Sequence, residues 1–600
     1  SPMLLSPDKK RTQFCGEITE DKYLDQVIVV NGWVNNYRDH GDLVFIDLRD
    51  RSGIIQLVFD PTDAAKAHEL SKTLRREDVI GAKGVLRKRA EGLENPRIPT
   101  GKYELCCTEL FIFNRSKTPP FDVTTGEKIN EEARLKYRYI DIRSPFMYDN
   151  LLKRSEITNS IRFSMQENGF LEVETPILTK STPEGARDFL VPSRVHKGSY
   201  FALPQSPQIF KQLLMIGGIE RYYQIARCFR DEDLRADRQP EFTQLDIETS
   251  FMTAEDIQTL IENMLSKMMK TVYNKEIKTP FLRMTYKDAM NKYGVDRPDM
   301  RFGMEVVDVS DIVKNSEFSV FTNVTAKGGM VKCLPVPNGE KLSRKDLDEL
   351  ITFVGNYGAK GMAWMRVKED VLESNIVKYF SPEIQAELIK KTEAHNGYAL
   401  LFIADNNDSI VYDSIGNLRL EVGDRFNLRP KDQFSFLWVV DFPLFEKDVE
   451  NNRWSSVHHP FTSPHADDIE KLMTDTRSVR ANAYDVICNG TELGGGSIRI
   501  ATSDMQSKIF ELLNISTEEA NEKFGFLLEA LANGAPPHGG IALGLDRMVM
   551  IFQQLDSIRD VIAFPKTQKA TCMLMDAPSS VDPQQLLDLS IKNIEVKVNR

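Results

Sequence analysis

Two arginines lie in sequence contexts suited to binding the phosphate groups of a nucleotide. Arg230 belongs to segment 227–241, RCFRDEDLRADRQPE, which carries four arginines and five acidic residues between two strand-like runs. Arg547 follows a Gly-Leu-Asp tripeptide at an expected helix start, where the helix dipole also favours an anion. Guanidinium groups pair bidentately with phosphoryl oxygens, so the two positions favour a nucleotide substrate. A solvated loop with internal ion pairs would also explain the charges of 227–241.

A glycine-rich segment, 492–499 with the sequence ELGGGSIR, combines groups that could bind a metal ion and a carboxylate. Glycines let a substrate approach the backbone, and Glu492 with Asp485 could hold Mg²⁺ through oxygen ligands. Arg499 could pair with a substrate carboxylate. A glycine-rich bend with a surface arginine would have the same pattern, so both interpretations stay open at this point.

Two adjacent histidines, His458 and His459, are of a residue type that binds metals or substrates. We expect them to be consecutive strand residues, whose side chains point to opposite faces. They could then not chelate one metal ion together. We therefore expect one of them to contact a substrate.

These candidate residues need elements to position them, and the chain divides into several predicted domains. Residues 1–115 show three strand-like runs, a helix-compatible stretch and two further strand-like runs. This order is typical of a five-stranded OB barrel, which offers a face to single-stranded nucleic acid. A barrel that binds a sugar or a protein would have the same order. Residues 116–140 are polar and contain prolines, so we predict a hinge or linker there.

The rest of the chain is predicted to form a catalytic domain with an insertion and an extension. Strand-like runs dominate 200–251 and return from 434 onward, which favours an antiparallel sheet over a β-α-β array. We therefore predict an α+β fold. Its parts are a catalytic domain of residues 141–289 and 431–565, an inserted α/β domain of 290–430 and a C-terminal extension of 566–600.

The composition excludes several classes of protein. The 600 residues are 41% hydrophobic and 28% charged, which is typical of a globular chain rather than a disordered or collagen-like one. No apolar run reaches the roughly 18 to 20 residues that span a bilayer, so we expect no membrane contact. Seven cysteines without a C-x-x-C motif predict neither a disulfide framework nor a zinc site, and they favour the reducing cytoplasm.

The net charge of −11 taken alone disfavours binding to nucleic acid, which needs a local excess of lysine and arginine. Segment 83–89, KGVLRKR, nevertheless carries four cations and no acid within the predicted barrel. The sequence has neither a P-loop nor a Rossmann glycine motif, so a nucleotide must be bound in another way.

Three ordered motifs resemble those of the class II aminoacyl-tRNA synthetases. They are GFLEVETPIL with Pro176, FRDED with the later QPEF, and GLDR. The further strings TPEGARDFLVPSR, QSPQIFKQ, RQPEFTQLD, HHPFT, GGGSIR and AFPK resemble bacterial-type aspartyl-tRNA synthetases over nearly the whole chain, and 290–430 is similar to the extra domain of that type. The resemblance implies an OB barrel, a class II antiparallel-sheet catalytic domain and a homodimer formed through the first motif.

The resemblance also implies a two-step, ATP-dependent ligase reaction and the residues that serve it. L-aspartate and ATP would form aspartyl-adenylate with Mg²⁺ present, and the terminal adenosine of tRNA(Asp) would then take the aspartyl group. Arg230 and Arg547 are the implied catalytic residues, because such a site must stabilise phosphoryl charge. The implied aspartate contacts are Glu184, Ser206, Gln208, Lys211, Arg230, Asp246, His458 and Arg499. The implied ATP contacts are Arg230, Asp231, Glu232, Gln239, Glu492, Gly544, Leu545, Asp546 and Arg547, and the implied metal ligands are Asp485 and Glu492.

The barrel would read the anticodon. Its implied tRNA contacts are Arg38, Phe45, Gln56, Arg87, Arg89 and Glu104. His40 and Gly92 are similar to relatives that also charge asparagine tRNA, whereas many relatives restricted to aspartate tRNA have leucine in place of His40 and a basic residue in place of Asn36. We therefore expect this chain to charge tRNA(Asn) as well as tRNA(Asp).

Two alternatives remain from the sequence. The chain could be a lysyl or asparaginyl ligase, or a catalytically inactive synthetase paralogue that acts as an RNA-binding protein. The presence of Arg230, Glu492, Arg499 and Arg547 argues against an inactive paralogue. A neutral amide substrate would not need a cationic pocket, and lysine would be repelled by one.

Overall fold

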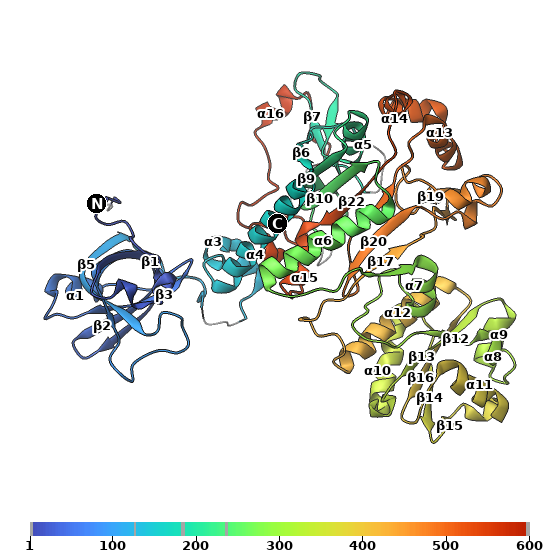
Figure 1. The fold of residues 1–600 in the computed structure, drawn as a ribbon, viewed down its shortest axis with the longest axis horizontal. Coiled ribbons are helices and arrows are strands. Elements are labelled where there is room, and N and C mark those ends of the chain that lie inside the picture. The colour runs from blue at the N-terminus through green and yellow to red at the C-terminus, as the bar shows by residue number, and fades with distance from the viewer. Residues whose placement is uncertain (1–3, 125–127, 182–185, 234–237, 596–600) are drawn as a thin grey trace. The chain divides into compact units, whose positions relative to one another are not determined.

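The computed structural model describes residues 4–124, 128–181, 186–233 and 238–595. They fall into two compact units (Figure 1). The first unit comprises residues 1–155, 234–239 and 557–581, and the second comprises 156–233, 240–556 and 582–600. Among the helices that the structure describes, none is long and apolar enough to cross a membrane.

The first unit contains a closed five-stranded barrel, which confirms the predicted OB fold. Its elements are β1 (Val27–His40), β2 (Leu43–Asp50), β3 (Gly53–Phe59), α1 (Ala65–Ser71), β4 (Val79–Lys88) and β5 (Tyr103–Asn114). The strand order is β1-β2-β3-β5-β4, and β3 and β5 pair in parallel. Side chains alternate along β2, so Val44, Ile46 and Leu48 fill the core while Phe45 and Asp47 face away from it.

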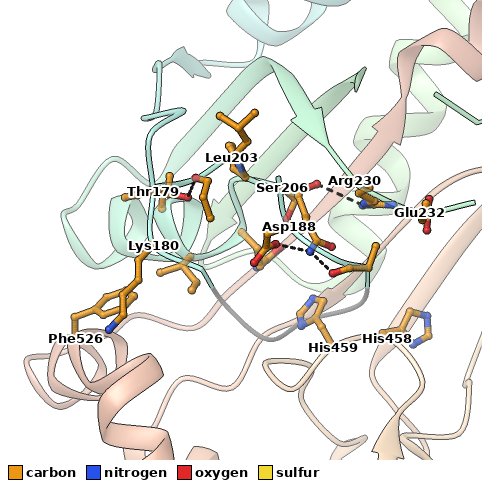
Figure 2. A pocket seen from close by; sticks show the side chains of 17 residues that line it. Thr179, Lys180, Asp188, Leu203, Ser206, Arg230, Glu232, His458, His459 and Phe526 are labelled. Atoms are coloured by element: carbon orange, nitrogen blue, oxygen red, sulfur yellow. Dashed lines mark hydrogen bonds between the residues drawn. The ribbon is translucent and has the colours of Figure 1, made fainter. Parts of the chain in front are cut away.

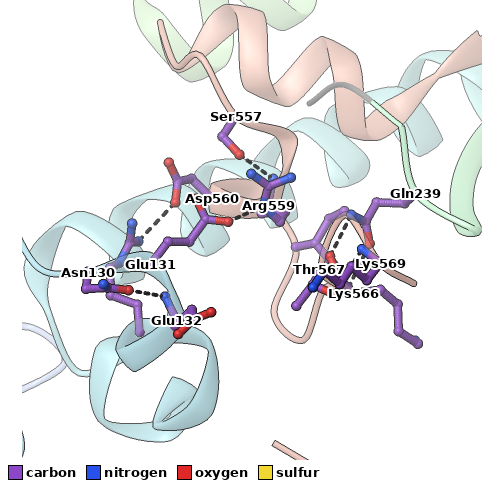
Figure 3. A network of polar contacts seen from close by, with 12 residues as sticks. Asn130, Glu131, Glu132, Gln239, Ser557, Arg559, Asp560, Lys566, Thr567 and Lys569 are labelled. Carbon is purple, nitrogen blue, oxygen red and sulfur yellow. Dashed lines mark hydrogen bonds and ion pairs between the residues drawn. The ribbon is translucent and has the colours of Figure 1, made fainter. Parts of the chain in front are cut away.

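Two short helices, α2 (Glu131–Lys136) and α3 (Arg138–Asp141), follow the barrel within the first unit. The side chain of Asn130 accepts a hydrogen bond from the backbone at the start of α2. Figure 3 shows the ion pairs that connect this region to the C-terminal part of the unit. Arg134 pairs with Asp560 at 2.9 Å, and Glu131 pairs with Arg559. The predicted hinge therefore has ordered helices of its own.

The second unit is built on an eight-stranded sheet of order β11-β17-β20-β21-β22-β10-β9-β6. The six strands from β17 to β9 pair antiparallel, as predicted, and the two edge strands pair in parallel. The strands are β6 (Leu171–Glu172), β9 (Arg221–Phe229), β10 (Glu241–Ser250), β11 (Leu282–Thr285), β17 (Phe436–Val440), β20 (Ala483–Cys488), β21 (Thr491–Ile498) and β22 (His538–Gly544).

Helices pack around this sheet. Helix α6 begins at a capping box formed by Thr253 and Asp256, which satisfies its first backbone N–H groups. Helix α4 (Pro145–Glu167) begins in the first unit and ends in the second. The longer helices that lie wholly in the second unit are α5 (Gln208–Ile216), α6 (Ala254–Tyr273), α7 (Tyr286–Tyr293), α13 (Ser503–Leu512), α14 (Thr517–Ala532) and α15 (Leu545–Phe552). The smaller elements are β7 (Leu190–Pro192), β8 (Tyr200–Ala202), β18 (Phe445–Asp448), β19 (Arg453–Ser456) and, in the C-terminal extension, α16 (Pro583–Asp588).

The insertion forms a separate five-stranded sheet of order β12-β13-β16-β14-β15. Its strands are β12 (Val307–Asp308), β13 (Met330–Val336), β14 (Ala363–Lys368), β15 (Val371–Glu373) and β16 (Ala399–Asp405). Its helices are α8 (Ser310–Val313), α9 (Ser319–Ala326), α10 (Arg344–Gly355), α11 (Pro382–Thr392) and α12 (Asp408–Arg425). The prediction of a mixed helix and strand domain is confirmed, but every strand pair in it is antiparallel rather than parallel. Helices cover both faces, because neighbouring residues of β16 such as Leu400 and Leu401 enter different cores.

Candidate active site

Two adjoining pockets lie in the second unit. The inner pocket has a volume of about 140 Å³ and is lined by residues of α5, β10, β21 and β22 and by the two histidines after β19. The outer pocket, shown in Figure 2, has a volume of about 590 Å³. The residues that line both are Ser206, Gln208, Arg230, His458 and His459. The two pockets are therefore continuous.

The inner pocket brings together seven of the eight residues predicted to contact aspartate. They are Ser206, Gln208, Lys211, Arg230, Asp246, His458 and Arg499. Glu184, the eighth, lies outside the described residues. The convergence is informative because these side chains come from segments more than two hundred residues apart in the sequence.

Two buried ion pairs form the floor of the inner pocket. Lys211 Nζ lies 3.1 Å from Asp246 Oδ1 and 3.8 Å from Glu248 Oε1. Arg499 donates to both oxygens of Glu248, from Nε at 3.1 Å and from Nη2 at 3.2 Å. Glu248 was not among the predicted site residues. The alternation of β10 could have revealed it, because residues 246 and 248 of a strand point to the same face.

The two carboxylates at the floor of the inner pocket, Asp246 and Glu248, have pKa values shifted in opposite directions. Burial raises the pKa of Asp246, and the attraction of Lys211 only partly opposes this shift. Burial also acts against ionisation of Glu248, but the cations of Arg499 and Lys211 outweigh it, so the pKa of Glu248 is lowered. Within the described chain, Asp246 Oδ2 has no hydrogen-bond partner. That oxygen is available to accept a hydrogen bond from a bound ammonium group.

The pocket is less cationic than the sequence suggested. Lys211 and Arg499 are each paired with a carboxylate. Arg230 is the third cation that lines the pocket. Among the described residues, these three cations and the carboxylates of Asp246 and Glu248 together carry one net positive charge. A ligand with one net negative charge would complete this balance.

The prediction that His458 and His459 are strand residues is wrong. They follow β19 in a bend, because the chain turns after Ser456, and both line the two pockets. His458 Nε2 lies 3.6 Å from Asp485 Oδ1. His459 accepts at Nδ1 from the backbone N–H of Phe461 and lies with Nε2 3.1 Å from Arg499 Nη1.

Both neighbours of the His459 ring are therefore donors. Burial lowers the pKa of His459 well below its usual range, and the positive charge of Arg499 lowers it further. Among the described residues, the neighbours of the two ring nitrogens offer no acceptor to an added proton. The ring is thus kept neutral beside Arg499.

Arg230 lies just after β9, at the junction of the two pockets. Its guanidinium stands 4.9 Å from the centre of the Phe242 ring, and its backbone N–H donates to Pro240 O at 2.9 Å. Glu232 lines the outer pocket, and the backbone N–H of Asp231 donates to Arg187 O. The charged segment between β9 and β10 is thus a site-forming loop where it is described, rather than a solvated hairpin.

Asp485 of β20, which is buried, and Glu492 of β21, which is half-buried, form a pair of carboxylates. A Cβ atom at Gly495 would lie 2.1 Å from Asp485 Oδ1 and 3.4 Å from Glu492 Oε1, so both carboxylates lie against this glycine and a larger residue would displace the Asp485 carboxylate. The negative charge of Asp485 together with burial raises the pKa of Glu492 to about 7. Asp485 Oδ1 has no hydrogen-bond partner among the described residues.

This pair fits Mg²⁺. The ion is usually bound by one or two carboxylates together with substrate phosphates. In the part of the chain that the structure describes, no group of three or more such ligands is present. Phosphate oxygens and water would have to complete the coordination shell.

Arg547 lies in the first turn of α15, as predicted, and its Nη1 donates to the backbone oxygen of Glu492 at 2.9 Å. Gly544 is the N-cap of this helix and Leu545 is buried. Asp546 is also buried, and its Oδ2 accepts from the backbone N–H of Thr243 at 2.8 Å. Asp546 thus connects α15 to β10.

Gln239 belongs to the first unit. Its Nε2 donates to Lys566 O at 2.9 Å, and its Oε1 accepts from Lys566 N at 2.8 Å (Figure 3). Both ends of the amide are engaged with the C-terminal segment of that unit. Its predicted contact with ATP stays a prediction.

The predicted anticodon residues form one patch on the barrel. Arg38 Nη2 donates to Gln56 Oε1 at 2.9 Å, and Arg87 Nη2 lies 3.1 Å from Glu104 Oε2. Gln56 is the strand partner of Glu104. Phe45 is the strand partner of Arg38. These contacts place the side chains on adjacent strands of one outer face.

Buried polar atoms of the same barrel have no partner among the described residues. They include Trp33 Nε1, Asn36 Oδ1 and Arg89 Nη2. Burial raises the pKa of Asp47, the strand partner of Asn36, although Arg38 opposes the shift. Unpartnered buried donors and acceptors are rare in a folded protein, so these atoms could accept contacts from a polar ligand.

The two residues predicted to affect tRNA choice lie in different settings. The His40 ring packs edge-on against Phe45, with ring centres 5.9 Å apart. Gly92 has a φ of 84° in the loop after β4, and nothing lies within 4 Å of a Cβ built there. His40 thus belongs to the patch, whereas Gly92 has no such contact.

Family models match both parts of the chain. The model of the class II tRNA synthetases (D, K and N) matches residues 130–568, and the OB-fold nucleic acid binding domain matches residues 28–113. The chain belongs to the class II tRNA synthetases. Its two pockets are therefore those of a synthetase catalytic domain.

Relatives of this synthetase are similar over nearly its full length. The "Aspartate--tRNA(Asp/Asn) ligase" of Natranaerobius thermophilus is 51% identical over 97% of this chain and 99% of its own. The protein of the same name from Bacillus subtilis is 52% identical, over 97% of this chain and 99% of its own. The "Aspartate--tRNA ligase" of Macrococcus caseolyticus is 52% identical, over 98% of this chain and 99% of its own.

Solved synthetase structures share the fold. A putative aspartyl-tRNA synthetase from Leishmania major has a TM-score of 0.60 at 17% identity and covers 94% of this chain and 96% of its own. The asparaginyl-tRNA synthetase from Pyrococcus horikoshii complexed with asparaginyl-adenylate has a TM-score of 0.58 at 19% identity, with 92% and 98% covered. These likenesses support the α+β architecture.

Proposed function

We propose that this chain is an aspartate-tRNA ligase, which activates L-aspartate with ATP and transfers it to tRNA(Asp). The inner pocket carries the proposal. The cations Lys211, Arg499 and Arg230 can bind the two carboxylates of aspartate, and Asp246 can bind its ammonium group. Aspartate carries one net negative charge, which matches the single positive excess of the described ion-pairing groups Lys211, Arg499, Arg230, Asp246 and Glu248.

The geometry supports aspartate over the two alternative amino acids. Asparagine has a neutral amide in place of the side-chain carboxylate and would leave one cation without an anion, which is costly in a buried site. Lysine would bring a second cation beside Lys211 and Arg499. An inactive paralogue would have no need of the buried ion pairs, and the relatives carry the names of ligases.

The first step is the formation of aspartyl-adenylate. An α-carboxylate oxygen attacks the α-phosphorus of ATP, and the bond from that phosphorus to the bridging oxygen breaks, so pyrophosphate leaves. Arg230 lies at the junction of the pockets, where it can contact both the α-carboxylate and the α-phosphate. Phe242 packs directly against the Arg230 guanidinium and so supports the position of that cation.

The phosphate end of ATP is assigned to Arg547 and the carboxylate pair. Asp485 and Glu492 would hold Mg²⁺, which would supply positive charge to the phosphate oxygens. Arg547 contacts the backbone of Glu492, and we assign it to the γ-phosphate. Asp231, Glu232, Gln239 and the turn of Gly544, Leu545 and Asp546 are proposed to complete the ATP site.

The second step needs no protein nucleophile. A hydroxyl of the terminal adenosine of tRNA attacks the carbonyl carbon of the adenylate, the bond from that carbon to the phosphate oxygen breaks, and AMP takes up the proton. The barrel patch of Arg38, Phe45, Gln56 and Glu104 is proposed to bind the anticodon.

We further propose that the enzyme charges tRNA(Asn). Relatives of equal similarity carry names for aspartate alone and for both tRNAs, so their names do not decide the question. The support comes from His40. Its ring contacts Phe45 within the anticodon patch, and a neutral imidazole can donate or accept a hydrogen bond.

We also propose a cytoplasmic homodimer. Apolar side chains around the first motif are strongly exposed, with 66% for Phe163, 53% for Leu171, 47% for Ile177 and 52% for Leu178. A second copy related by twofold symmetry would cover them. The seven cysteines are free thiols, which suits a reducing compartment. A monomer in light scattering at micromolar concentration would contradict the dimer.

Aminoacylation of purified tRNA(Asp) and tRNA(Asn) with radiolabelled aspartate tests the proposed function. We expect aspartate to be attached to tRNA(Asp). We also expect tRNA(Asn) to be charged within a thousandfold of that rate. If tRNA(Asp) accepts no aspartate while the protein is folded, the ligase assignment is wrong.

A further inference from the structure

Among the described residues, packing rather than hydrogen bonding holds the ring of His458, which lines both pockets (Figure 2). Its buried Nδ1 has no hydrogen-bond partner in the described chain, and the 3.6 Å from Nε2 to Asp485 Oδ1 is longer than a hydrogen bond. The ring of Phe442 meets the His458 ring edge to face, with ring centres 4.7 Å apart and an angle of 88° between the planes. This contact therefore sets the plane of the imidazole.

Phe442 is fixed in turn by the core and by a second aromatic ring. It is buried in a cluster that includes residues of β17 and β20 and Ala289 of α7. Its backbone oxygen accepts from the N–H of Ala481 at 2.7 Å. The ring of Tyr286, the first residue of α7, has its centre 5.3 Å from that of Phe442. Tyr286, Phe442 and His458 thus form an aromatic column that runs from α7 to the active site.

The inserted domain holds the helix at the start of this column. Gly294, the C-cap of α7, has a φ of 72°, and a Cβ there would lie 2.9 Å from the backbone nitrogen of Gly416 in α12. A Cβ at Gly416 would lie 2.9 Å from Val295 Cγ1 and 3.0 Å from Gly294 O. Lys332 of β13 is fully buried, and its Nζ donates to the backbone and side-chain oxygens of Asn291 in α7, at 2.8 Å and 2.9 Å. Two separate contacts thus fix α7 against the insertion.

We propose that Phe442 and Tyr286 are positioning residues that orient the His458 ring for aspartate, and that the inserted domain holds this aromatic column in place through α7. The proposal rests on the proposed ligase function and gives the insertion a part in amino-acid binding. A displaced imidazole would weaken the binding of aspartate, because the aspartate site is assigned to the inner pocket that His458 lines. The phosphates of ATP are assigned to Arg547 and the carboxylate pair, so the KM for ATP should change less.

Steady-state pyrophosphate exchange with the full-length chain tests the aromatic column. Phe442→Leu should raise the KM for aspartate about fivefold, the effect of one lost ring contact, while kcat and the KM for ATP stay within twofold of wild type. Tyr286→Leu should raise the KM for aspartate about threefold, and Tyr286→Phe, which keeps the ring, should match wild type. Tyr286 is half-buried, so its variants test the column even if Phe442→Leu does not fold.

Phe281→Leu is the matched control for these variants. Phe281 is also a buried phenylalanine of the second unit, and it stacks on Phe436 with ring centres 4.9 Å apart. It lines neither the inner nor the outer pocket. This control should lose stability without a higher KM for aspartate. An equal rise of that KM in Phe281→Leu and Phe442→Leu would overturn the positioning role.

A double variant tests the route from the insertion. In Gly416→Ala the new Cβ must push α12 away from the end of α7, and the residue lines neither pocket. We expect the KM for aspartate to rise about threefold, no more than the loss of one ring contact would cause. Gly355→Ala, also in the insertion but with nothing within 4 Å of its Cβ, should not raise it.

The combination Gly416→Ala, Phe442→Leu should have the KM for aspartate of Phe442→Leu alone, because both changes act through one column. A KM raised by the product of the two single effects would contradict a shared route, and it would overturn the part given to the insertion.

The outcomes separate this proposal from the ligase assignment. Absence of aspartate-dependent exchange in wild type would refute the ligase function itself. Normal exchange in wild type, with an unchanged KM for aspartate in both Phe442→Leu and Tyr286→Leu, would refute the positioning role alone. A fall of kcat with an unchanged KM would assign the column to the stability of the sheet, and it would also overturn the proposal.

Discussion

Glu248 holds Arg499 by two hydrogen bonds, from Nε to Oε2 at 3.1 Å and from Nη2 to Oε1 at 3.2 Å, and both side chains are almost wholly buried. Two hydrogen bonds prevent the guanidinium from rotating, so its remaining N–H groups point in one direction. Glu248 is therefore a positioning residue for the cation that we assign to the side chain of aspartate.

The first prediction follows from this contact. Glu248→Gln should lower kcat/KM for aspartate in pyrophosphate exchange about thirtyfold, roughly 2 kcal/mol, mainly through a higher KM. The neutral amide would hold Arg499 less firmly and would leave one more cation unbalanced. Steady-state exchange over a range of aspartate concentrations measures both parameters.

Glu262→Gln is the matched control. Glu262 is also a buried glutamate of the second unit, and it accepts from the backbone N–H of Phe281 and from Trp438 Nε1. This variant should lose stability without a specific rise in the KM for aspartate. Equal KM values for aspartate in wild type and Glu248→Gln would show that Glu248 does not position Arg499 for aspartate binding.

Much of the site was readable from the sequence because its residues lie in short, characteristic strings. Arg230, Arg499 and Arg547 were found in this way, and alternation along strands predicted the barrel. Strand alternation places Glu248 on the same face as Asp246, but only the fold brings Arg499, 251 residues away, against it. The bend at His458 and His459 was missed because only the fold ends β19 at Ser456.

The outer pocket could not be predicted for a similar reason. Phe526 is one of several aromatic residues in its segment, and nothing in the sequence separates it from the buried Phe524. Only the packing of α14 shows which ring faces the pocket. Tertiary contacts between distant segments, rather than local propensity, decide such positions.

The second prediction concerns pH and His459. The pKa of this histidine is lower in the folded chain than its unfolded value of about 6.5, so the unfolded state binds the extra proton first as the pH falls. Stability should therefore decrease as the pH drops from 7.5 to 5.5, by at most about 1.4 kcal/mol per pH unit from this one group. His459→Gln should reduce that slope.

Urea unfolding of the second unit's sheet, followed by tryptophan fluorescence at the two pH values, measures the slope. His196→Gln serves as the control, because His196 is exposed. This control should keep the wild-type slope. An unchanged slope in His459→Gln would show that the buried ring does not set the pH dependence.

The third prediction concerns the carboxylate pair. In Gly495→Ala the new Cβ would lie 2.1 Å from Asp485 Oδ1, so the Asp485 carboxylate must move. We expect exchange to fall at least tenfold and the Mg²⁺ concentration for half-maximal rate to rise. Gly355→Ala is the control, because nothing lies within 4 Å of a Cβ at that position. Normal Mg²⁺ dependence in Gly495→Ala would argue against Asp485 as a ligand.

The fourth prediction concerns the choice of tRNA. His40→Leu should shift the ratio of kcat/KM values toward tRNA(Asp) over tRNA(Asn) about fivefold, roughly 1 kcal/mol, because it removes a hydrogen-bonding ring that packs on Phe45. Gly92→Ala should shift it less, since Gly92 has no contact within the patch. Competition between the two tRNAs measures the ratio. A larger shift in Gly92→Ala would contradict the role given to His40.

The central claim is that the inner pocket selects aspartate by balancing charge, and amino-acid-dependent pyrophosphate exchange tests it most directly. Wild type should exchange with aspartate and show at least a thousandfold lower kcat/KM with asparagine or lysine. Arg499→Ala and Arg230→Ala should each reduce exchange with aspartate by roughly 2 to 4 kcal/mol, at least thirtyfold. Exchange with asparagine or lysine as good as with aspartate, or activity within tenfold of wild type in Arg499→Ala, would contradict the account.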